Sequence, residues 1–196
     1  MHPKLYDRLR SIICPFEKII ENVPKKAGEL LDIGSGYGTF CFILSKERPK
    51  LKITGIEKDK KRVNAANNRV AANSNLNFAC ADITCFSANK RYDVITCLDL
   101  IHHIPKKDHL AIFKKINELL KENGRLIVKD MNDKPLYKYL WNYVHDFIMT
   151  RSLEMYYVPK EEMTKLLEEN GFVTEFVKNI PNLLYAHYVV VCKKSG

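Results

Sequence analysis

The sequence predicts an α/β protein with a doubly wound, mainly parallel sheet, and three observations predict it. Short apolar runs of strand length alternate with stretches in which apolar residues recur at helical spacing, from about residue 30 to residue 130. The first run, 30–33, passes through a glycine-rich segment directly into a helical pattern. Acidic residues stand at or beside the ends of the runs, and parallel strands bring such ends to one edge of the sheet.

Size and composition fit one domain, which we expect to cover residues 1–196. A chain of 196 residues with 46% hydrophobic content can bury one full core. We expect no membrane span, because no run of eighteen apolar residues occurs, and residues 1–8 lack the apolar centre of a secretory signal. The six cysteines show no Cys-x-x-Cys spacing, which favours free thiols, no metal site and a cytoplasmic location.

The net charge of +9 admits a nucleic-acid or acidic-membrane partner. The basic residues are spread over several predicted helices and mixed with glutamates, and they form no continuous block. A solvated basic surface is therefore favoured over an RNA-binding groove, and nucleic acid stays a possible partner that is not favoured.

Residues 1–26 predict an amphipathic helical lead-in that covers one edge of the core, because apolar residues recur there at helical spacing. Residues 30–33 then predict a buried parallel strand, and the helix after the glycines runs to about Lys46.

Gly34, Ser35, Gly36 and Gly38 connect that strand to that helix. Alternate glycines let the backbone turn sharply and approach a ligand, and a helix start adds unpaired N–H groups. The spacing differs from the Gly-x-Gly-x-x-Gly of dinucleotide-binding loops. Asp32 beside the loop suits a ligand that carries a cation or a free amine. The alternative is an ordinary glycine-rich turn.

The second and third strands, 51–57 and 76–80, also end near acids. Glu57 lies about twenty residues past the glycines, the offset at which an acid meets ribose hydroxyls; the alternative is a surface acid. Asp59 is expected to cap a helix that runs to about residue 72. Asp82 can accept an adenine amino group while Ile83 covers the ring, or it can simply cap the next turn.

The fourth strand, 92–98, leads into a loop that places His102 and His103 over the site. At most one of two adjacent histidines faces a substrate, and His103 is the preferred candidate. A helix over 106–121 is expected to end in a cap at Gly124, followed by a fifth strand over 124–130.

Residues 132–158 interrupt the alternation with an aromatic helix over 136–150. We interpret this segment as a lid over an apolar or aromatic substrate, with Tyr143, His145 and Asp146 as its polar candidates. The alternative is a packing helix or a dimer face. A last helix over 159–170 is followed by strands over 172–177 and 184–192, which form a hairpin that adds one antiparallel strand.

With the glycine loop, Glu57, Asp82 and the segment after the fourth strand in register, the chain resembles the class I S-adenosylmethionine (SAM)-dependent methyltransferases from end to end. Residues 98–104, with their His-His-Ile sequence, resemble the small-molecule subgroup. The resemblance implies a Rossmann-like seven-stranded sheet in the order 3-2-1-4-5-7-6, with strand 7 antiparallel and helices on both faces. It also implies SAM as cofactor and S-adenosylhomocysteine as product.

Carried over by position, the resemblance assigns a part of SAM to each cofactor-site candidate. The methionine part falls to Asp32 and the Gly34–Gly38 backbone, and the ribose to Glu57, with Lys58 beside it. Adenine falls to Asp82 and Ile83. The backbone around Leu98 and Asp99 meets the amino group. The motif of base N-methylating members and the metal site of catechol-type members are not evident.

Methyl transfer needs mainly positioning and water exclusion, and a phenol, acid or activated carbon also needs a base. The candidates are His103, Asp130 and His145. The lid resembles that of enzymes of polyketide, aryl-polyene or lipid pathways, which implies a hydrophobic or aromatic acceptor, free or on an acyl carrier protein. An RNA or ribosomal methyltransferase and a non-catalytic SAM-binding scaffold are the alternatives. The sequence predicts no oligomeric state.

Overall fold

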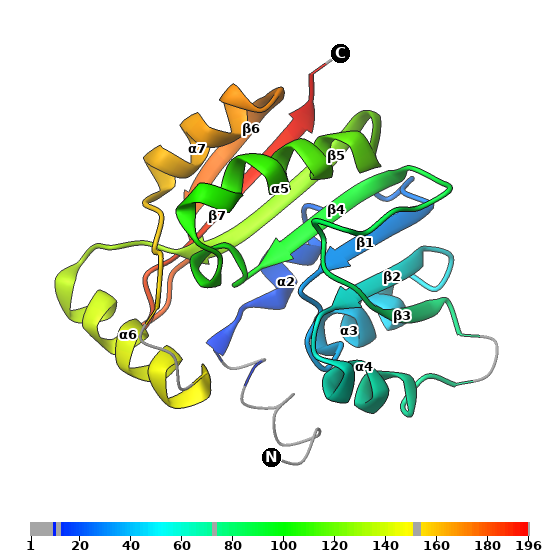
Figure 1. The fold of residues 1–196 in the computed structure, drawn as a ribbon, viewed down its shortest axis with the longest axis horizontal. Helices are drawn as coiled ribbons and strands as arrows, with labels where there is room; N and C mark the ends of the chain where they lie inside the picture. Colours follow the sequence, from blue (N-terminus) through cyan, green and yellow to red (C-terminus); the bar gives the residue numbers. More distant parts are fainter. Residues whose placement is uncertain (1–9, 11–12, 72–73, 151–153, 196) are drawn as a thin grey trace.

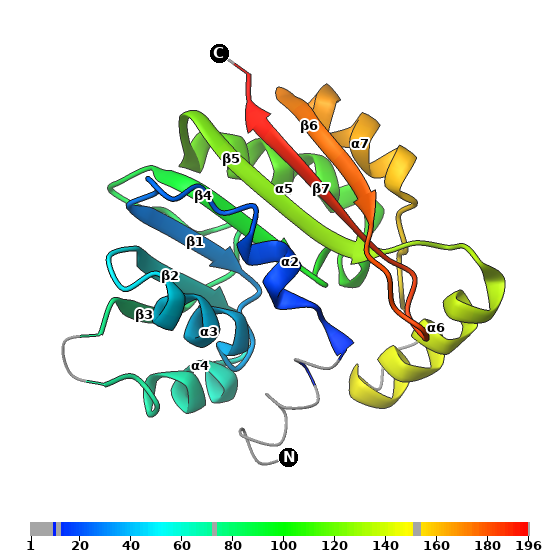
Figure 2. The same cartoon turned by 180° about the vertical axis from the view of Figure 1, so that it is seen from behind.

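The computed structural model describes residues 10, 13–71, 74–150 and 154–195, and in them a seven-stranded sheet lies between two layers of helices (Figures 1 and 2). The strand order is β3-β2-β1-β4-β5-β7-β6, and β7 runs antiparallel to both of its neighbours. The predicted fold class, strand order and strand direction are therefore confirmed. The strands are β1 (Glu29–Ile33), β2 (Lys52–Glu57), β3 (Leu76–Cys80), β4 (Tyr92–Leu98), β5 (Leu120–Met131), β6 (Phe172–Asn179) and β7 (His187–Lys194).

The helices cover both faces of the sheet because successive strand residues point to opposite sides. Leu30 of β1 packs in the core shared with α2, α3 and α4, whereas Leu31 packs in the core shared with α5 and α7. Figure 1 shows the α5 and α7 side, and Figure 2 shows the α2 and α3 side. The helices are α2 (Phe16–Ile20), α3 (Thr39–Glu47), α4 (Lys60–Asn67), the short 3-10 helix η1 (Ile101–His103), α5 (Lys106–Leu119), α6 (Leu136–Thr150) and α7 (Lys160–Glu169).

Several helix boundaries follow the predicted chemistry. Asp59 caps α4 by accepting hydrogen bonds from the backbone N–H groups of Lys61 and Arg62 at 2.8 and 3.3 Å. The aromatic helix α6 covers the predicted residues. The lead-in over 1–26 falls partly outside the described residues, but α2 within it packs Phe16 against Phe40 of α3, with ring centroids 5.7 Å apart.

Four predicted boundaries were wrong, and the first is the start of the fifth strand, which lies at Leu120 and not at residue 124. Helix α4 ends at Asn67, well before residue 72, and β7 begins at His187, three residues later than expected. Gly124 does not cap α5. The helix ends at Leu119 because buried Leu120 already pairs with Tyr92 of β4, and the turn before Gly124 uses Asn123 in the left-handed region, at φ 59°.

The carboxyl ends of β1, β2, β4 and β5 point to the same edge of the sheet, where α6 stands apart from the other helices (Figure 1). In an open α/β sheet this edge is where ligands bind. The fold therefore gathers the acids at the strand ends, the glycine loop and α6 around one space.

Candidate active site

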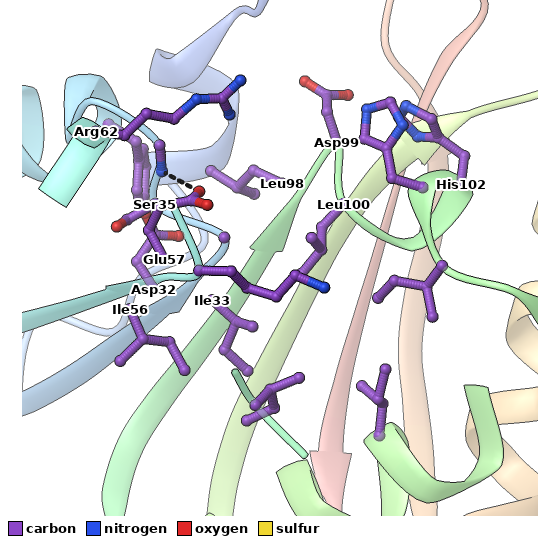
Figure 3. Close-up of a pocket in the computed structure, with 18 of the residues that line it drawn as sticks. Asp32, Ile33, Ser35, Ile56, Glu57, Arg62, Leu98, Asp99, Leu100 and His102 are labelled. Carbon is purple, nitrogen blue, oxygen red and sulfur yellow. Dashed lines mark hydrogen bonds between the residues drawn. The ribbon is translucent and has the colours of Figure 1, made fainter. Parts of the chain in front are cut away.

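A cavity of about 720 Å³ occupies this edge of the sheet (Figure 3). Its volume lies in the usual range for small-molecule sites. It runs from the glycine loop to the inner face of α6, and two of the predicted site residues, Gly38 and Asp130, are absent from its wall. The predicted residues that line it are Asp32, Gly34, Ser35, Gly36, Glu57, Lys58, Asp82, Ile83, Leu98, Asp99, His103 and His145.

The glycine loop has a backbone that other residues rarely adopt. Gly34, Gly36 and Gly38 have φ values of 73°, 57° and 77°. A Cβ on Gly38 would stand 2.5 Å from the Phe78 ring, so this glycine serves helix packing, with Gly38 at the N-cap of α3. Nothing lies within 4 Å of a Cβ built on Gly36, which faces open space. The loop therefore offers bare backbone to the cavity at Gly36.

Glu57 is tied to the glycine loop. Its carboxylate accepts hydrogen bonds from the Gly36 N–H at 3.1 Å and from the Asp59 N–H at 3.0 Å. Each oxygen thus takes one backbone donor and keeps a further lone pair. Because Glu57 also lines the cavity, it can accept two hydroxyl donors from a ligand without losing its orientation.

Asp32 is a buried carboxylate at the end of β1, below the loop. It accepts hydrogen bonds from the Thr96 hydroxyl at 2.7 Å and the Cys41 thiol at 3.2 Å. Burial raises the pKa of Asp32 to about 6, against the opposing effect of these hydrogen bonds. A cationic ligand group beside this carboxylate would favour its ionised form. An ammonium ligand for Asp32 stays a prediction from the sequence, and a buried carboxylate is compatible with it.

Asp82 performs the capping role that the sequence left open. One oxygen accepts hydrogen bonds from the Thr84 N–H at 2.9 Å and hydroxyl at 2.8 Å, and the other lies 3.5 Å from the Lys58 ammonium. The backbone hydrogen bond from Thr84 is the largest of the effects that hold the pKa of Asp82 below its ordinary value. Asp82 still lines the cavity beside Ile83, so the cap orients a carboxylate that a ligand can reach.

Asp99 belongs to a buried group of charges that sequence reasoning missed. Its carboxylate pairs with the Lys129 ammonium and, at 2.6 Å, with the Arg10 guanidinium. Burial alone would raise the pKa of Asp99, but Lys129 and then Arg10 bring it well below its usual range. Lys129 is fully buried, and its place within the apolar run 126–129 is the one sequence signal that pointed to this partner.

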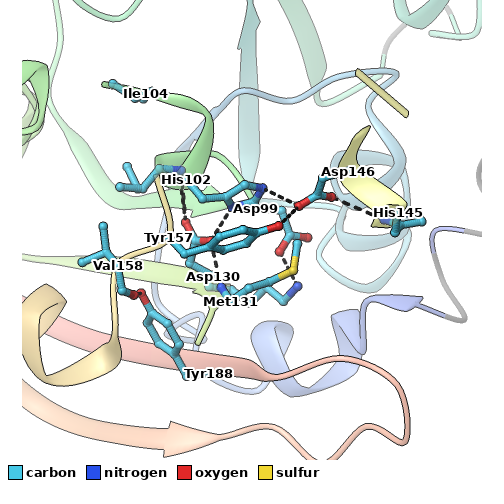
Figure 4. Close-up of polar contacts among 12 residues, drawn as sticks. Asp99, His102, Ile104, Asp130, Met131, His145, Asp146, Tyr157, Val158 and Tyr188 are labelled. Carbon is cyan, nitrogen blue, oxygen red and sulfur yellow. Dashed lines mark hydrogen bonds and ion pairs between the residues drawn. The ribbon is translucent and has the colours of Figure 1, made fainter. Parts of the chain in front are cut away.

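Asp130 is buried outside the cavity wall and orients His102 (Figure 4). Its carboxylate accepts hydrogen bonds from the backbone N–H groups of Ile101 and His102 at 3.1 and 3.3 Å, and it lies 2.5 Å from His102 Nδ1. The expected role of Asp130 as a base that contacts the acceptor does not fit this position, because these donors occupy the buried carboxylate. Burial would lower the pKa of His102, but Asp130 outweighs it and raises the pKa.

Helix α6 is tied to the same histidine (Figure 4). Asp146 of α6 lies 3.5 Å from His102 Nε2 and accepts a hydrogen bond from the Tyr157 hydroxyl at 2.6 Å. Tyr157 stacks on the His102 ring, with centroids 5.3 Å apart and planes 11° apart. Asp146 was a polar candidate in the sequence, whereas Tyr157 carried no signal beyond its aromatic type. These contacts hold α6 against η1.

His103 presents its ring to the cavity. The residue is exposed, and its ring centroid lies 4.0 Å from that of His102. Partial desolvation in the cavity and, after it, the neighbouring His102 hold the pKa of His103 below its ordinary value. The ring is therefore neutral at pH 7 and can accept a proton. His145 also lines the cavity and lies 3.3 Å from Asp146 through Nδ1.

Comparisons with known proteins agree with this architecture. Residues 6–175 match a family model described as a methyltransferase domain. Demethylmenaquinone methyltransferase of Staphylococcus aureus is 25% identical over 205 residues, covering 90% of this chain and 83% of that protein. Malonyl-[acyl-carrier protein] O-methyltransferase 1 of Ilyobacter polytropus is 25% identical over 150 residues, covering 74% and 53%. The chain spans about half of the length of this second relative, and less of some others.

A solved structure shows the same fold over nearly the whole chain. The crystal structure of magnesium protoporphyrin IX methyltransferase from Synechocystis PCC 6803 with bound S-adenosylhomocysteine superimposes with a TM-score of 0.72 at 18% identity, covering 97% of this chain and 84% of that one. With the family model matching most of its length, the chain belongs to the SAM-dependent methyltransferase-domain family and has the class I fold.

Proposed function

We propose that the protein transfers a methyl group to a small hydrophobic or aromatic acceptor. The observation that carries this proposal is the single cavity that joins the glycine loop to His103 and the inner face of α6. A cofactor held at one end and an acceptor held at the other would then share one water-excluding space.

The loop end of the cavity fits SAM. The buried Ser35 hydroxyl has no hydrogen-bond partner among the described residues, and it lines the cavity beside Gly36. We assign the methionine part to Asp32 and the loop backbone, the ribose hydroxyls to Glu57 with Lys58 beside it, and adenine to Asp82 and Ile83. The backbone at Leu98 and Asp99 completes this end. Bound SAM would supply a methyl group on a sulfonium sulfur. A nucleophile attacks that methyl carbon in line with the S–CH₃ bond, and the sulfur leaves as the thioether of S-adenosylhomocysteine.

The other end of the cavity fits an apolar acceptor with one acidic proton. Met131 of β5 lines the cavity there together with His103, His145 and Asp146. Aromatic and apolar side chains with a few polar groups favour a hydrophobic ring or chain that carries a polar reacting group. His103 would take a proton from a hydroxyl, acid or activated carbon, and His145 is the second candidate. Asp130 acts through His102 as a positioning residue.

Two of the relatives have names that support an acceptor of this chemistry, whereas two others are named as N-methyltransferases of coclaurine and phosphoethanolamine. The first two are a quinone-directed enzyme and one that acts on a malonyl group on an acyl carrier protein. A carrier-bound acceptor is the finer form of the proposal, since a basic chain with net charge +9 suits an acidic carrier.

Calorimetric titration with SAM tests the cofactor end. We expect micromolar binding, weakened about 10²- to 10⁴-fold in Glu57→Ala, because two hydrogen bonds to a charged group, each about 1.5–3 kcal/mol, are lost. Glu47→Ala, an exposed acid on α3, is the matched control and should bind as the unmodified protein does. Absence of SAM binding by folded protein would refute the proposal.

Methyl transfer to a panel of quinols, phenols and carrier-bound acyl groups tests the acceptor end. For the acceptor that turns over, His103→Ala should lower kcat by about 10²- to 10⁴-fold, the usual contribution of a general base, with an unchanged Kd for SAM. Unchanged turnover would remove His103 from the mechanism and direct attention to His145.

A further inference from the structure

Helix α6 carries an unusually apolar outer face. Seven large apolar side chains on it are between 43% and 66% exposed. They are Leu136, Tyr137, Leu140, Trp141, Val144, Phe147 and Ile148. Such a contiguous apolar patch on the surface of a protein marks an interaction site.

The seven side chains share one face of the helix. At about 100° per residue they fall within an arc of about 140°. The opposite face carries Asn142 and Asp146, which are buried, and the aromatic residues Tyr139 and Tyr143 pack near buried Tyr157. The inner contacts of Asp146 with His102 and Tyr157 fix how the helix is rotated. The apolar residues therefore point outward because the polar ones are held inward.

The loop between β6 and β7 extends this face. Leu183 is 85% exposed and Leu184 is 44% exposed. The loop lies against α6, because the Lys138 ammonium donates a hydrogen bond to the Asn182 carbonyl and the Tyr185 ring packs edge-on against His145 at 5.5 Å. Both ribbon views show this loop beside α6, at the end of the molecule away from β3 (Figures 1 and 2). We call the seven helix residues with Leu183 and Leu184 the lid surface.

The net charge of the chain, and not the charges beside the lid surface, favours an anionic partner. None of the nine residues is charged, and the one acid of α6 is buried on the other face. Beside the helix, exposed Lys134 is balanced by the neighbouring Asp133 and by exposed Glu154, whereas the whole chain carries a charge of +9. An equally basic second copy would be repelled, whereas an anionic lipid surface would attract the protein. The aromatic pair Tyr137 and Trp141 suits the headgroup region.

We propose that the lid surface docks on anionic lipid membranes, with α6 lying in the interface plane. The helix has 15 residues, fewer than the roughly 20 needed to cross a bilayer. In the part of the chain that the structure describes, no helix has the length and hydropathy of a membrane span. The inner face of the docked helix lines the cavity through His145 and Asp146. Docking thus brings the cavity next to the lipid phase, where hydrophobic molecules concentrate.

Trp141 provides a direct probe, since it is the single tryptophan of the chain and lies on the lid surface. We expect the full chain to float with vesicles of phosphatidylglycerol and phosphatidylcholine. On binding, the Trp141 emission should shift to the blue and be quenched by brominated lipid. Vesicles of phosphatidylcholine alone should bind more weakly, because they lack the electrostatic attraction.

Two substitutions on the lid surface give the decisive comparison. Leu140→Glu and Val144→Glu should each lower partitioning about tenfold, the effect of losing one buried apolar side chain. Leu110→Glu is the matched control, because Leu110 of α5 is 61% exposed but lies outside the lid surface. It should bind vesicles as the unmodified protein does. Circular dichroism confirms that each variant is folded.

Two results would overturn the proposal. One is an unshifted Trp141 spectrum with anionic vesicles, or equal partitioning of the lid and Leu110 variants. The other is a blue shift that rises with protein concentration in the absence of lipid, together with a doubled mass in light scattering, because the lid surface would then bind a second copy. Neither readout depends on methyl transfer, so this proposal and the proposed function fail independently.

Discussion

The two ends of the cavity are built in different ways. At the glycine-loop end, residues 32–38 form a continuous segment whose backbone conformation sets the geometry, with Glu57 and Asp82 at or just after the ends of the next two strands. At the α6 end, the key side chains come from the residue after β4, from η1, β5 and α6, and from the segment before α7. The geometry of the first end depends on the backbone conformation of the glycine loop, and that of the second depends on a network of buried polar side chains.

The comparison teaches how each end should respond to substitution. The glycine loop should lose stability when a side chain is added to it, because the new side chain strains the backbone and overlaps with neighbouring atoms. The buried polar network should lose stability when one partner is removed, because the remaining buried group then lacks the hydrogen bond or ion pair that offset its desolvation. The following variants test this difference, beginning with the largest expected effect.

Lys129→Met should destabilise the protein by about 3–5 kcal/mol, since it leaves the buried Asp99 carboxylate without its main partner. Urea unfolding measures the loss. Asp99→Asn in the same chain should recover part of it, because it removes the uncompensated charge. A loss below about 1 kcal/mol for Lys129→Met would contradict the importance of this ion pair.

Gly38→Ala should cost about 2–4 kcal/mol, from the left-handed backbone and from contact with the buried Phe78 ring. Gly28→Ala is the matched control, because a Cβ there meets only an ordinary contact at 3.6 Å from Asp93. Thermal or urea unfolding compares the two variants. If both variants lose the same stability, neither the left-handed backbone at Gly38 nor its contact with Phe78 requires glycine at this position.

Asp130→Asn should destabilise the protein by about 1.5–3 kcal/mol at pH 6, because the charged hydrogen bond to His102 is lost. The folded-state pKa of His102 is raised, so its contribution is fully present below the unfolded pKa of about 6.5 and disappears as the pH rises through the folded value. The destabilisation should therefore shrink at pH 9. Urea unfolding at the two pH values checks this, and a larger loss at pH 9 would reverse the assigned sign.

The affinity for SAM should fall as the pH drops below about 6, the pKa of Asp32 in the free protein. In the proposed complex the ammonium group of SAM would pair with the ionised carboxylate, so each pH unit below that value should lower the affinity by up to about tenfold. Calorimetry between pH 5 and 8 measures the slope. Asp32→Asn should bind more weakly with little pH dependence, and an equally steep slope in this variant would assign the titration to another group.

Most of the fold was predictable because its signals are local. Alternating apolar runs, the Asp59 cap and the glycines fixed the strands, their order of appearance and most helix starts. The errors fell at ends that tertiary pairing decides. Leu120 lies outside α5 because it pairs with Tyr92 of the neighbouring strand, and no local feature of residues 119–124 predicts that pairing.

The site divides in the same way. The sequence alone determined the glycine loop and the acids at the strand ends, since a left-handed turn and a strand terminus depend on neighbours in the chain. The tertiary structure alone decided that Lys129 and Arg10 pair with Asp99, that Asp130 serves His102, and that the apolar face of α6 points outward. These outcomes depend on which side chains meet across long sequence separations, and on burial, which multiplies the cost of every unpaired charge.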